Sequence, residues 1–201
     1  MKTKKIFIPL FILLIAGLSS SAQLLDSLAL SKEPEYTDLN EALKNPDKVY
    51  KLNLRKQKLT AIPKDVFKFT HLQELNLSRN KITNLPSALF KLTNLEVLDV
   101  SANKIDTLPS GIGKLVNIKK LILNQNVITQ LPKTIGNLSK MYLLDLWGNY
   151  VKEFPDAILK LKNTLKVIDM RVISISEDQQ EDMVKQLPNT KFFFSKSCNC
   201  G

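Results

Sequence analysis

A motif of leucine, asparagine and proline returns along this chain every 23 residues. One unit has the spacing L-x-x-L-x-L-x-x-N-x-Φ-x-x-L-P, where Φ is an apolar residue. Three positions align without gaps through successive units: Leu52, Leu75, Leu98, Leu121 and Leu144; Gln57, Asn80, Asn103, Asn126 and Asn149; Pro63, Pro86, Pro109, Pro132 and Pro155. A unit this short cannot enclose a core of its own, so the units must stack and bury an apolar strip between neighbours. The chain is therefore predicted to form a solenoid.

Each unit contains a short strand. In the second unit Leu75 and Leu77 alternate with Glu74, Asn76 and Ser78, so the leucines face one way and the polar residues the other. Strands that recur at a constant spacing run in the same direction and pair as a parallel sheet, with the rest of each unit forming a right-handed return. The apolar positions of the return are predicted to point inward as well.

The asparagine and proline columns have structural explanations. Where the chain turns inward after the strand, backbone groups lose their ladder partners, and a buried amide can both donate to them and accept from them. The proline that follows an apolar residue fixes an extended segment and prevents a long helix. Both columns are assigned to the scaffold rather than to ligand binding.

The repeat decays at both ends, as expected of a capped solenoid. Residues 36–43 are predicted to form a short helix with Asp38 as N-cap and Glu41 reaching back to it. At the far end Ile173 occupies the asparagine position, residues 176–187 are predicted to form a capped helix, and residues 191–194 a closing strand. The predicted segments are a signal peptide at 1–22, an N-terminal cap region at 23–47, about six repeats at 48–174, a C-terminal cap at 175–195 and a tail at 196–201.

The N-terminus has the pattern of a secretory signal peptide. Basic residues precede an apolar run over residues 6–18, and small residues precede Gln23. The run is short for a membrane span, so we expect a secreted, periplasmic or extracellular protein, with an uncleaved N-terminal membrane anchor as the alternative. The only cysteines, Cys198 and Cys200, lie in the tail, where they form an inert end, pair with each other, or pair with another chain.

The repeat resembles that of leucine-rich-repeat proteins, in the 23-residue type in which Leu-Pro follows the asparagine turn. The resemblance covers about residues 48–170, and Gln57 and Ile173 depart from the pattern only at the ends. It implies an α/β-type solenoid, a right-handed horseshoe with a parallel β-sheet on its concave face, a short helical N-terminal cap and a helix-strand C-terminal cap. Such a fold is used to bind macromolecules but does not specify the ligand.

The outward strand positions map the predicted concave face. Trp147, the only tryptophan, shares this surface with Asp145, and aromatic residues and arginine dominate interface hot spots. The predicted protein-binding residues are Trp147, Tyr142, Asp145, Asn124, Arg171 and Tyr150. The alternative is that Trp147 only covers neighbouring apolar side chains. We expect a monomeric, non-enzymatic interaction module with a protein partner.

A second set of exposed positions, in the N-terminal half, is basic. The predicted anion-binding residues are Arg55, Lys56, Arg79 and Lys81, with Lys51, Lys58 and Lys104 nearby. The whole chain carries a net charge of +10 and stays basic when the lysines of the signal peptide are removed. This favours anionic partners but also serves solubility. The alternative function is therefore an envelope-associated adhesin that binds a polyanion. If these residues have no ligand, they form a solvated edge that only keeps the protein soluble.

Few residues are suited to catalysis. His71 is the sole histidine, and no partner is fixed for it by spacing, so a hydrolase would have to be built around this residue alone. No phosphate-binding glycine loop or metal-ligand spacing occurs. Asp99 and Asp145 are separated by the strand of Ile122, which argues against a cation site. We expect no cofactor, no metal and no small-molecule substrate.

Overall fold

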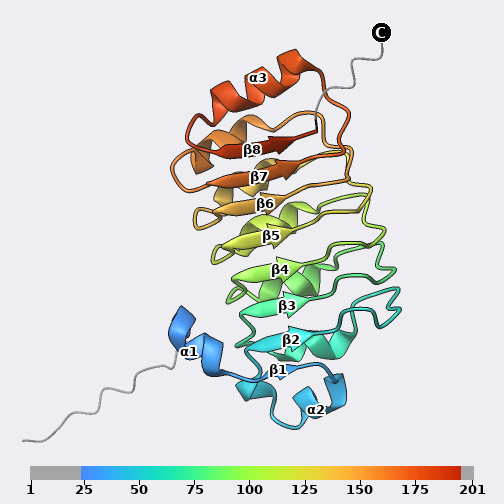
Figure 1. The fold of residues 1–201 in the computed structure, drawn as a ribbon. Coiled ribbons are helices and arrows are strands. Elements are labelled where there is room, and N and C mark those ends of the chain that lie inside the picture. Colours follow the sequence, from blue (N-terminus) through green and yellow to red (C-terminus); the bar gives the residue numbers. More distant parts are fainter. Residues whose placement is uncertain (1–23, 196–201) are drawn as a thin grey trace, which may run out of the picture.

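A computed structural model describes residues 24–195 as one stack of short coils (Figure 1). Its parallel sheet has eight strands in sequence order: β1 Glu35–Tyr36, β2 Lys51–Asn53, β3 Glu74–Asn76, β4 Val97–Asp99, β5 Lys120–Ile122, β6 Leu143–Asp145, β7 Val167–Met170 and β8 Lys191–Phe194. From β2 to β5 each strand pairs with the residues 23 positions further along the chain. The predicted solenoid and its parallel sheet are confirmed.

The returns carry single-turn 3-10 helices on the other side of the solenoid (Figure 1). They are η1 Pro46–Lys48, η2 Lys64–Lys68, η3 Ser87–Lys91, η4 Ser110–Lys114, η5 Lys133–Asn137 and η6 Asp156–Leu161. From η2 onward a repeat proline directly precedes each helix, as Pro109 does with φ −64° and ψ 150°. The backbone is still extended at the proline, and the 3-10 helix begins at the next residue, which is the effect expected of proline.

The core is a continuous apolar strip between sheet and returns. In a central repeat Leu98, Val100, Ile105 and Ile112 are all fully buried. The first repeat is less enclosed, since Leu59 is only partly buried. Truncating a fully buried leucine of this kind typically removes about 2–5 kcal/mol of stability, so each repeat depends on its neighbours for a dry interior.

The asparagine column forms the predicted ladder. The Asn126 side-chain amide donates to the carbonyls of Val100 and Leu123 at 3.0 and 2.8 Å, and its Oδ1 accepts from the backbone N–H of Ile105 at 3.0 Å. Equivalent bonds are made by Asn80, Asn103 and Asn149. Gln57 differs: its side chain is exposed and donates at 2.9 Å to the carbonyl of Thr37 in the N-terminal cap.

The N-terminal cap contains α2, Leu39–Leu43, with Asp38 as its N-cap. The Asp38 carboxylate accepts from the backbone N–H groups of Asn40 and Glu41, as predicted. The prediction that the Glu41 side chain reaches back to Asp38 was wrong, because the Glu41 carboxylate pairs with Lys44 at 2.8 Å. Leu39 and Leu43 pack against the core and cover its first coil.

A further helix, α1 Ser27–Lys32, was not predicted. It precedes β1 and lies beside the strands near one side of the sheet (Figure 1). The Gln73 side-chain amide accepts from the backbone N–H of Leu25 at 2.8 Å and donates to its carbonyl at 3.0 Å. This pair of bonds fixes the start of the helix to the chain just ahead of β3.

The C-terminal cap matches the predicted helix and strand. Helix α3, Glu177–Gln186, begins with a full capping box between Ser176 and Gln179. Strand β8 pairs in parallel with β7, and Met183, Leu187 and Ile173 are buried over the last coil. The apolar residue in place of asparagine thus joins the core where no further repeat follows.

The predicted signal peptide at 1–22 and the cysteine-containing tail at 196–201 lie outside the described residues. Within residues 24–195, no helix has both the length and the apolar character needed to cross a bilayer.

Candidate functional site

The sheet presents three outward columns on its concave face, and the strand register aligns them as predicted. One column joins Lys51, Glu74, Val97, Lys120, Leu143 and Val167; the middle column joins Asn53, Asn76, Asp99, Ile122, Asp145 and Asp169. The third column follows the strand ends and contains Arg55, Ser78, Ser101, Asn124, Trp147 and Arg171. The third column is interrupted, because Ser78 is buried and bonded to Asn76.

Asp145 is the centre of a polar cluster on the C-terminal half of this face. One carboxylate oxygen accepts from the Asn124 side-chain amide at 2.6 Å, and the other accepts from the backbone N–H of Trp147 at 3.1 Å. Its partner in the neighbouring strand is Asp169. These contacts fix the carboxylate in one orientation, so the surface around Trp147 is preorganised.

The environment of Asp145 disfavours its charge. Partial burial raises the pKa of this carboxyl above its ordinary value of 3.8, and the neighbouring carboxylate of Asp169 acts in the same direction. The hydrogen bonds from Asn124 and Trp147 and the positive charge of Arg171 lower the pKa of Asp145 but do not cancel the effect of burial. A cationic group brought close to Asp145 by a partner would favour the charged form of this carboxyl and would in turn be stabilised by it.

Arg171 connects this cluster to the last strand. Its guanidinium holds the Asp169 carboxylate at 2.6 Å, and this hydrogen bond, with the attraction between the two charges, raises the pKa of Arg171. The same guanidinium lies 5.8 Å from the Phe193 ring centroid, and Lys191 approaches that ring to 4.8 Å. Phe193 and Lys191 were missed as surface residues, although the alternation along residues 191–194 places them beside Asp169 and Val167.

Trp147 lies two residues after the end of β6 and is half-buried. Its carbonyl accepts from the backbone N–H of Gln125 at 2.7 Å, and the next residue, Gly148, has a left-handed backbone with φ 66°. The turn therefore fixes the backbone of Trp147 on both sides. Part of Trp147 remains accessible, and its backbone N–H holds the Asp145 carboxylate.

The two predicted tyrosines lie elsewhere. Tyr142 precedes β6, so the strand separates it from Trp147, and it borders a hollow of about 370 Å³ beneath α1. The lysine ammonium of Lys120 lies 6.0 Å from the Tyr142 ring centroid. Tyr150 is 60% exposed on the turn after Asn149. The structure thus joins Trp147, Asp145, Asn124 and Arg171 through the Asp145–Asp169 pair and leaves both tyrosines outside that cluster.

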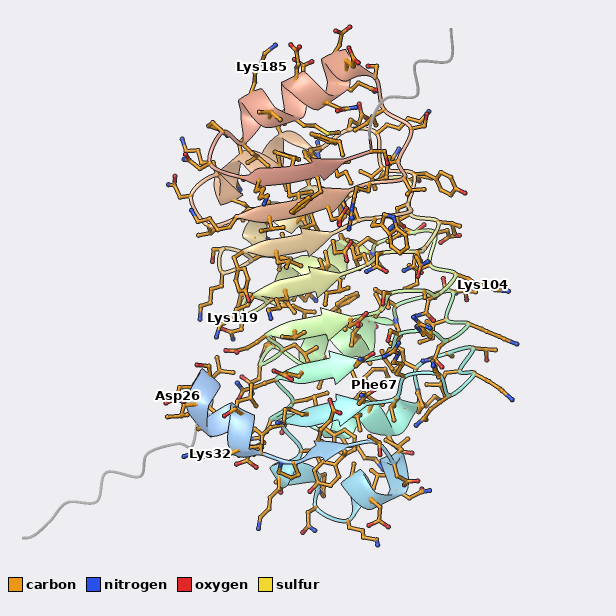
Figure 2. The ribbon with its side chains drawn as sticks, viewed as in Figure 1. Asp26, Lys32, Phe67, Lys104, Lys119 and Lys185 are labelled. Atoms are coloured by element: carbon orange, nitrogen blue, oxygen red, sulfur yellow. The ribbon has the colours of Figure 1, made fainter. Side chains whose placement is uncertain are left out.

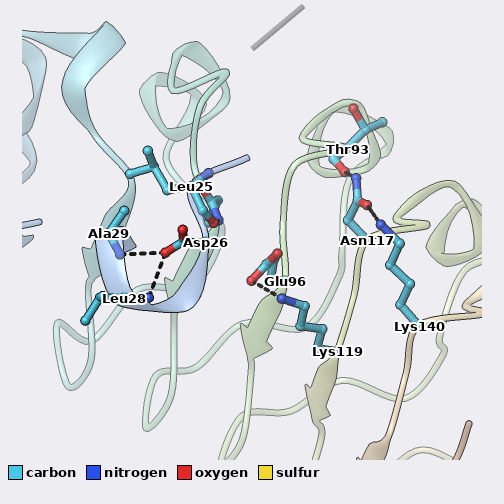
Figure 3. A network of polar contacts seen from close by, with 10 residues as sticks. Leu25, Asp26, Leu28, Ala29, Thr93, Glu96, Asn117, Lys119 and Lys140 are labelled. Atoms are coloured by element: carbon cyan, nitrogen blue, oxygen red, sulfur yellow. Dashed lines mark hydrogen bonds and ion pairs between the residues drawn. The ribbon is translucent and has the colours of Figure 1, made fainter. Parts of the chain in front are cut away.

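The hollow beneath α1 also contains a charge pair between neighbouring coils. Glu96 is almost fully buried, and its carboxylate accepts from the Lys119 ammonium at 2.9 Å (Figure 3). Because each charge has its partner there, we assign this pair to joining the coils that carry β4 and β5. His71 packs edge-to-face on Tyr50, with ring centroids 6.0 Å apart.

The predicted anion-binding residues form one connected group on the turns after β2, β3 and β4. We call Arg55, Lys56, Lys58, Arg79, Lys81 and Lys104 the basic strip; all six are exposed. Lys104 extends from the turn after β4, away from the ribbon (Figure 2). The basic strip is therefore on the half of the solenoid opposite to Trp147.

A family model described as Leucine rich repeat matches residues 47–105 and, again, residues 93–151. The chain belongs to the leucine-rich-repeat family. The two matches overlap and together span more than half of the chain, over the coils that carry the asparagine ladder. The outer turns of this leucine-rich-repeat protein, with α1, α3 and β8, lie outside the matched residues.

Two solved bacterial leucine-rich-repeat structures resemble this one. A leucine-rich-repeat protein of Leptospira interrogans is 28% identical with a TM-score of 0.63, covering 81% of this chain and 48% of its own. Internalin C2 of Listeria monocytogenes is 25% identical with a TM-score of 0.65, covering 82% of this chain and 69% of its own. The chain thus spans about half the length of the Leptospira protein.

The leucine-rich-repeat ectodomain of the Arabidopsis thaliana receptor kinase GASSHO1/SCHENGEN3, solved in complex with Casparian strip integrity factor 2, shares the fold. It is 24% identical with a TM-score of 0.53, covering 74% of this chain and 21% of its own. No curated protein matches the sequence at a significant level. The similarities therefore concern the repeat scaffold.

Proposed function

We propose that this leucine-rich-repeat protein is a secreted or periplasmic, monomeric and non-enzymatic module that binds a protein partner on its concave sheet. The supporting observation is the preorganised cluster of Trp147, Asp145, Asn124 and Arg171, in which hydrogen bonds and an ion pair fix the two carboxylates, and the Asp145 carboxylate accepts from the backbone N–H of Trp147. Interface hot spots have this composition, with aromatic residues and arginine held in place before binding.

The relatives are consistent with a binding role. One is an internalin, and another is a receptor ectodomain that was solved in complex with a second molecule. A catalytic role has less support, because the single histidine is used in packing against Tyr50. The finer assignment, to Trp147 as anchor, is our proposal.

The test compares capture by the wild-type chain with capture by a Trp147→Ala variant. A partner recovered by the wild type should bind the variant at least about 2 kcal/mol more weakly, which is roughly a 30-fold rise in Kd measured by calorimetry. The half-buried indole lies on the sheet surface, so the urea midpoint of the variant should change little.

The matched control is Leu159→Ala, which truncates a side chain that is 42% exposed on η6. This variant should bind as the wild type does. Equal affinity of the Trp147→Ala variant and the wild type would remove Trp147 from the interface. An equal loss of affinity in the Leu159→Ala variant would show that the interface is not confined to the concave sheet.

A further inference from the structure

The basic strip contains six cations without ion-pair partners among the described residues. None of its side chains takes part in any of the salt bridges found over residues 24–195. Elsewhere in the same stretch, lysines such as Lys119 are matched by a carboxylate on a neighbouring coil. Other lysines of residues 24–195, such as Lys91 and Lys114, also lack a carboxylate partner, but in the basic strip six such cations lie together on the turns after three consecutive strands.

The solenoid places these cations in rows. The backbone N–H of Lys81 donates to the carbonyl of Leu59 at 2.7 Å, and that of Lys104 donates to the carbonyl of Ile82 at 2.9 Å. Lys58, Lys81 and Lys104 therefore follow one another on adjacent coils, which are spaced by about 4.8 Å in a parallel sheet. Like charges held at such spacing repel one another, and an anion that bridges them relieves the repulsion.

The scaffold does not explain this row. Lysines on the other side of the solenoid, Lys91 and Lys114, end 3-10 helices, where a cation interacts favourably with free carbonyl groups. The lysines of the basic strip have no such position. Lys56 and Arg79 adopt left-handed backbone, with φ 59° and 57°, as Ala102 and Gln125 do at the same place in the next two units, so the fold does not require a charged side chain at this position. Their charge, rather than their conformation, is the property that suits this surface.

The neighbouring side chains indicate what kind of anion fits. Two residues beyond Lys58 and Lys81 are the exposed hydroxyl residues Thr60 and Thr83, and the equivalent residue beyond Lys104 is the exposed Asp106. Thr83 already accepts from the Asn84 amide at 3.0 Å, which leaves its hydroxyl hydrogen as a donor. Ammonium groups alternating with hydroxyls match a chain of sugar acids, which carries carboxylates or sulfates and hydroxyls in regular alternation.

Other polyanions fit less well. Single-stranded nucleic acid is bound by basic grooves that include aromatic rings for base stacking, and the basic strip contains no aromatic residue. Surface binding to lipid combines basic residues with an apolar face that enters the bilayer, whereas the basic strip is bordered by the polar residues Thr60, Thr83 and Asp106. We propose that the basic strip binds a linear acidic polysaccharide along the axis of the solenoid. This site is independent of the proposed protein-binding surface.

The experiment uses the purified full chain and measures binding to polyguluronate and to heparin at low and at physiological salt. The test variant is Lys58→Gln/Lys81→Gln/Lys104→Gln. The control variant, Lys91→Gln/Lys114→Gln/Lys160→Gln, removes the same net charge from exposed lysines on the 3-10 helices. Urea denaturation of both variants establishes that the fold is retained.

The wild type and the control variant should bind at least one glycan with similar affinity, and the strip variant should bind it at least tenfold more weakly. The slope of log affinity against log salt should also be shallower for the strip variant, because fewer ions are released. Equal losses in the two variants would show a net-charge effect and overturn the site.

Two further probes test the ligand class. A single-stranded oligo-dT and vesicles of phosphatidylglycerol are measured with the same three proteins. Weaker binding to both than to the glycans is the expected result. Tighter binding of either probe through Lys58, Lys81 and Lys104 would overturn the assignment to an acidic polysaccharide. Both results are independent of the Trp147→Ala measurement.

Discussion

Four asparagine side chains act as links between coils. Asn126 binds one carbonyl on its own coil, at Leu123, and both a carbonyl and an N–H on the preceding coil, at Val100 and Ile105. Each amide therefore satisfies buried backbone groups that the turn has removed from the strand ladder. At the first coil the exposed Gln57 instead binds the N-terminal cap, because no earlier asparagine turn exists for it to bind.

Replacing Asn126 with Ala is expected to lower the free energy of unfolding by about 3 kcal/mol or more, because three buried backbone groups lose their partner. Urea denaturation measures the change. The control is Asn117→Ala, whose amide donates to Thr93 at 2.9 Å from a partly exposed position and should cost about 1 kcal/mol. Similar losses in the two variants would contradict the role of the ladder.

Asp145 is expected to make the protein less stable as pH rises. Its pKa is higher in the folded chain than the ordinary 3.8, so the folded state holds the proton more tightly than the unfolded state. The stabilising contribution is complete below the unfolded pKa and is lost as pH rises through the folded pKa. Asp145→Asn should therefore gain stability relative to the wild type between pH 3.5 and pH 7.

Urea denaturation of both proteins at the two pH values measures this difference. Asp169→Asn serves as a comparison, since it removes the neighbouring carboxylate but also releases Arg171. An Asp145→Asn variant that lost stability relative to the wild type over this range would show that the hydrogen bonds from Asn124 and Trp147 outweigh burial.

At the scale of the elements, the cap helices show which signals are local enough to be predicted. Helices α2 and α3 carry an N-cap and a first-turn acidic residue within a few positions, and both form as predicted. Helix α1 has an N-cap too, at Asp26, but its position depends on Gln73, 48 residues away from Leu25. A contact between residues so far apart in the chain does not appear as a periodic pattern in the sequence.

The candidate site was predicted in part for the same reason. The 23-residue register correctly places Asn124, Asp145 and Trp147 on one surface. The same register puts Tyr142 ahead of the strand and Trp147 beyond its end, so the grouping of Tyr142 with Trp147 relied on closeness in sequence, and the strand separates them. Phe193 was missed because residues 191–194 were predicted only as a closing strand, and their side chains were not assigned to the outward columns.

Replacing Gln73 with Ala is expected to release α1 while the repeats stay folded. Two hydrogen bonds hold Leu25, and Gln73 is almost fully buried, so the global loss should be about 1–2 kcal/mol. Hydrogen exchange should become faster over residues 25–33 and remain unchanged in β5 and β6. Ser31→Ala, an exposed change on the same helix, is the control. Unchanged exchange at the helix would show that Leu30 packing alone holds it.

At the scale of the molecule, the solenoid separates two kinds of surface along its length. The basic strip lies on the turns of the first coils, and the cluster around Trp147 lies on the sheet near the last coils. Because each coil contacts mainly its neighbours, a change in one surface has little effect on the other. The two proposed ligands can therefore bind the same chain together.

The constant length of the inner coils also determines how this protein can change over time. From β2 to β6 every strand pairs with residues 23 positions away, and every asparagine reaches one coil back. Duplicating one whole unit would preserve all of these pairings, whereas deleting a single residue would disturb them. Such a protein gains binding area by whole repeats, and its sheet can lengthen to contact a larger partner while the core of each existing repeat stays the same.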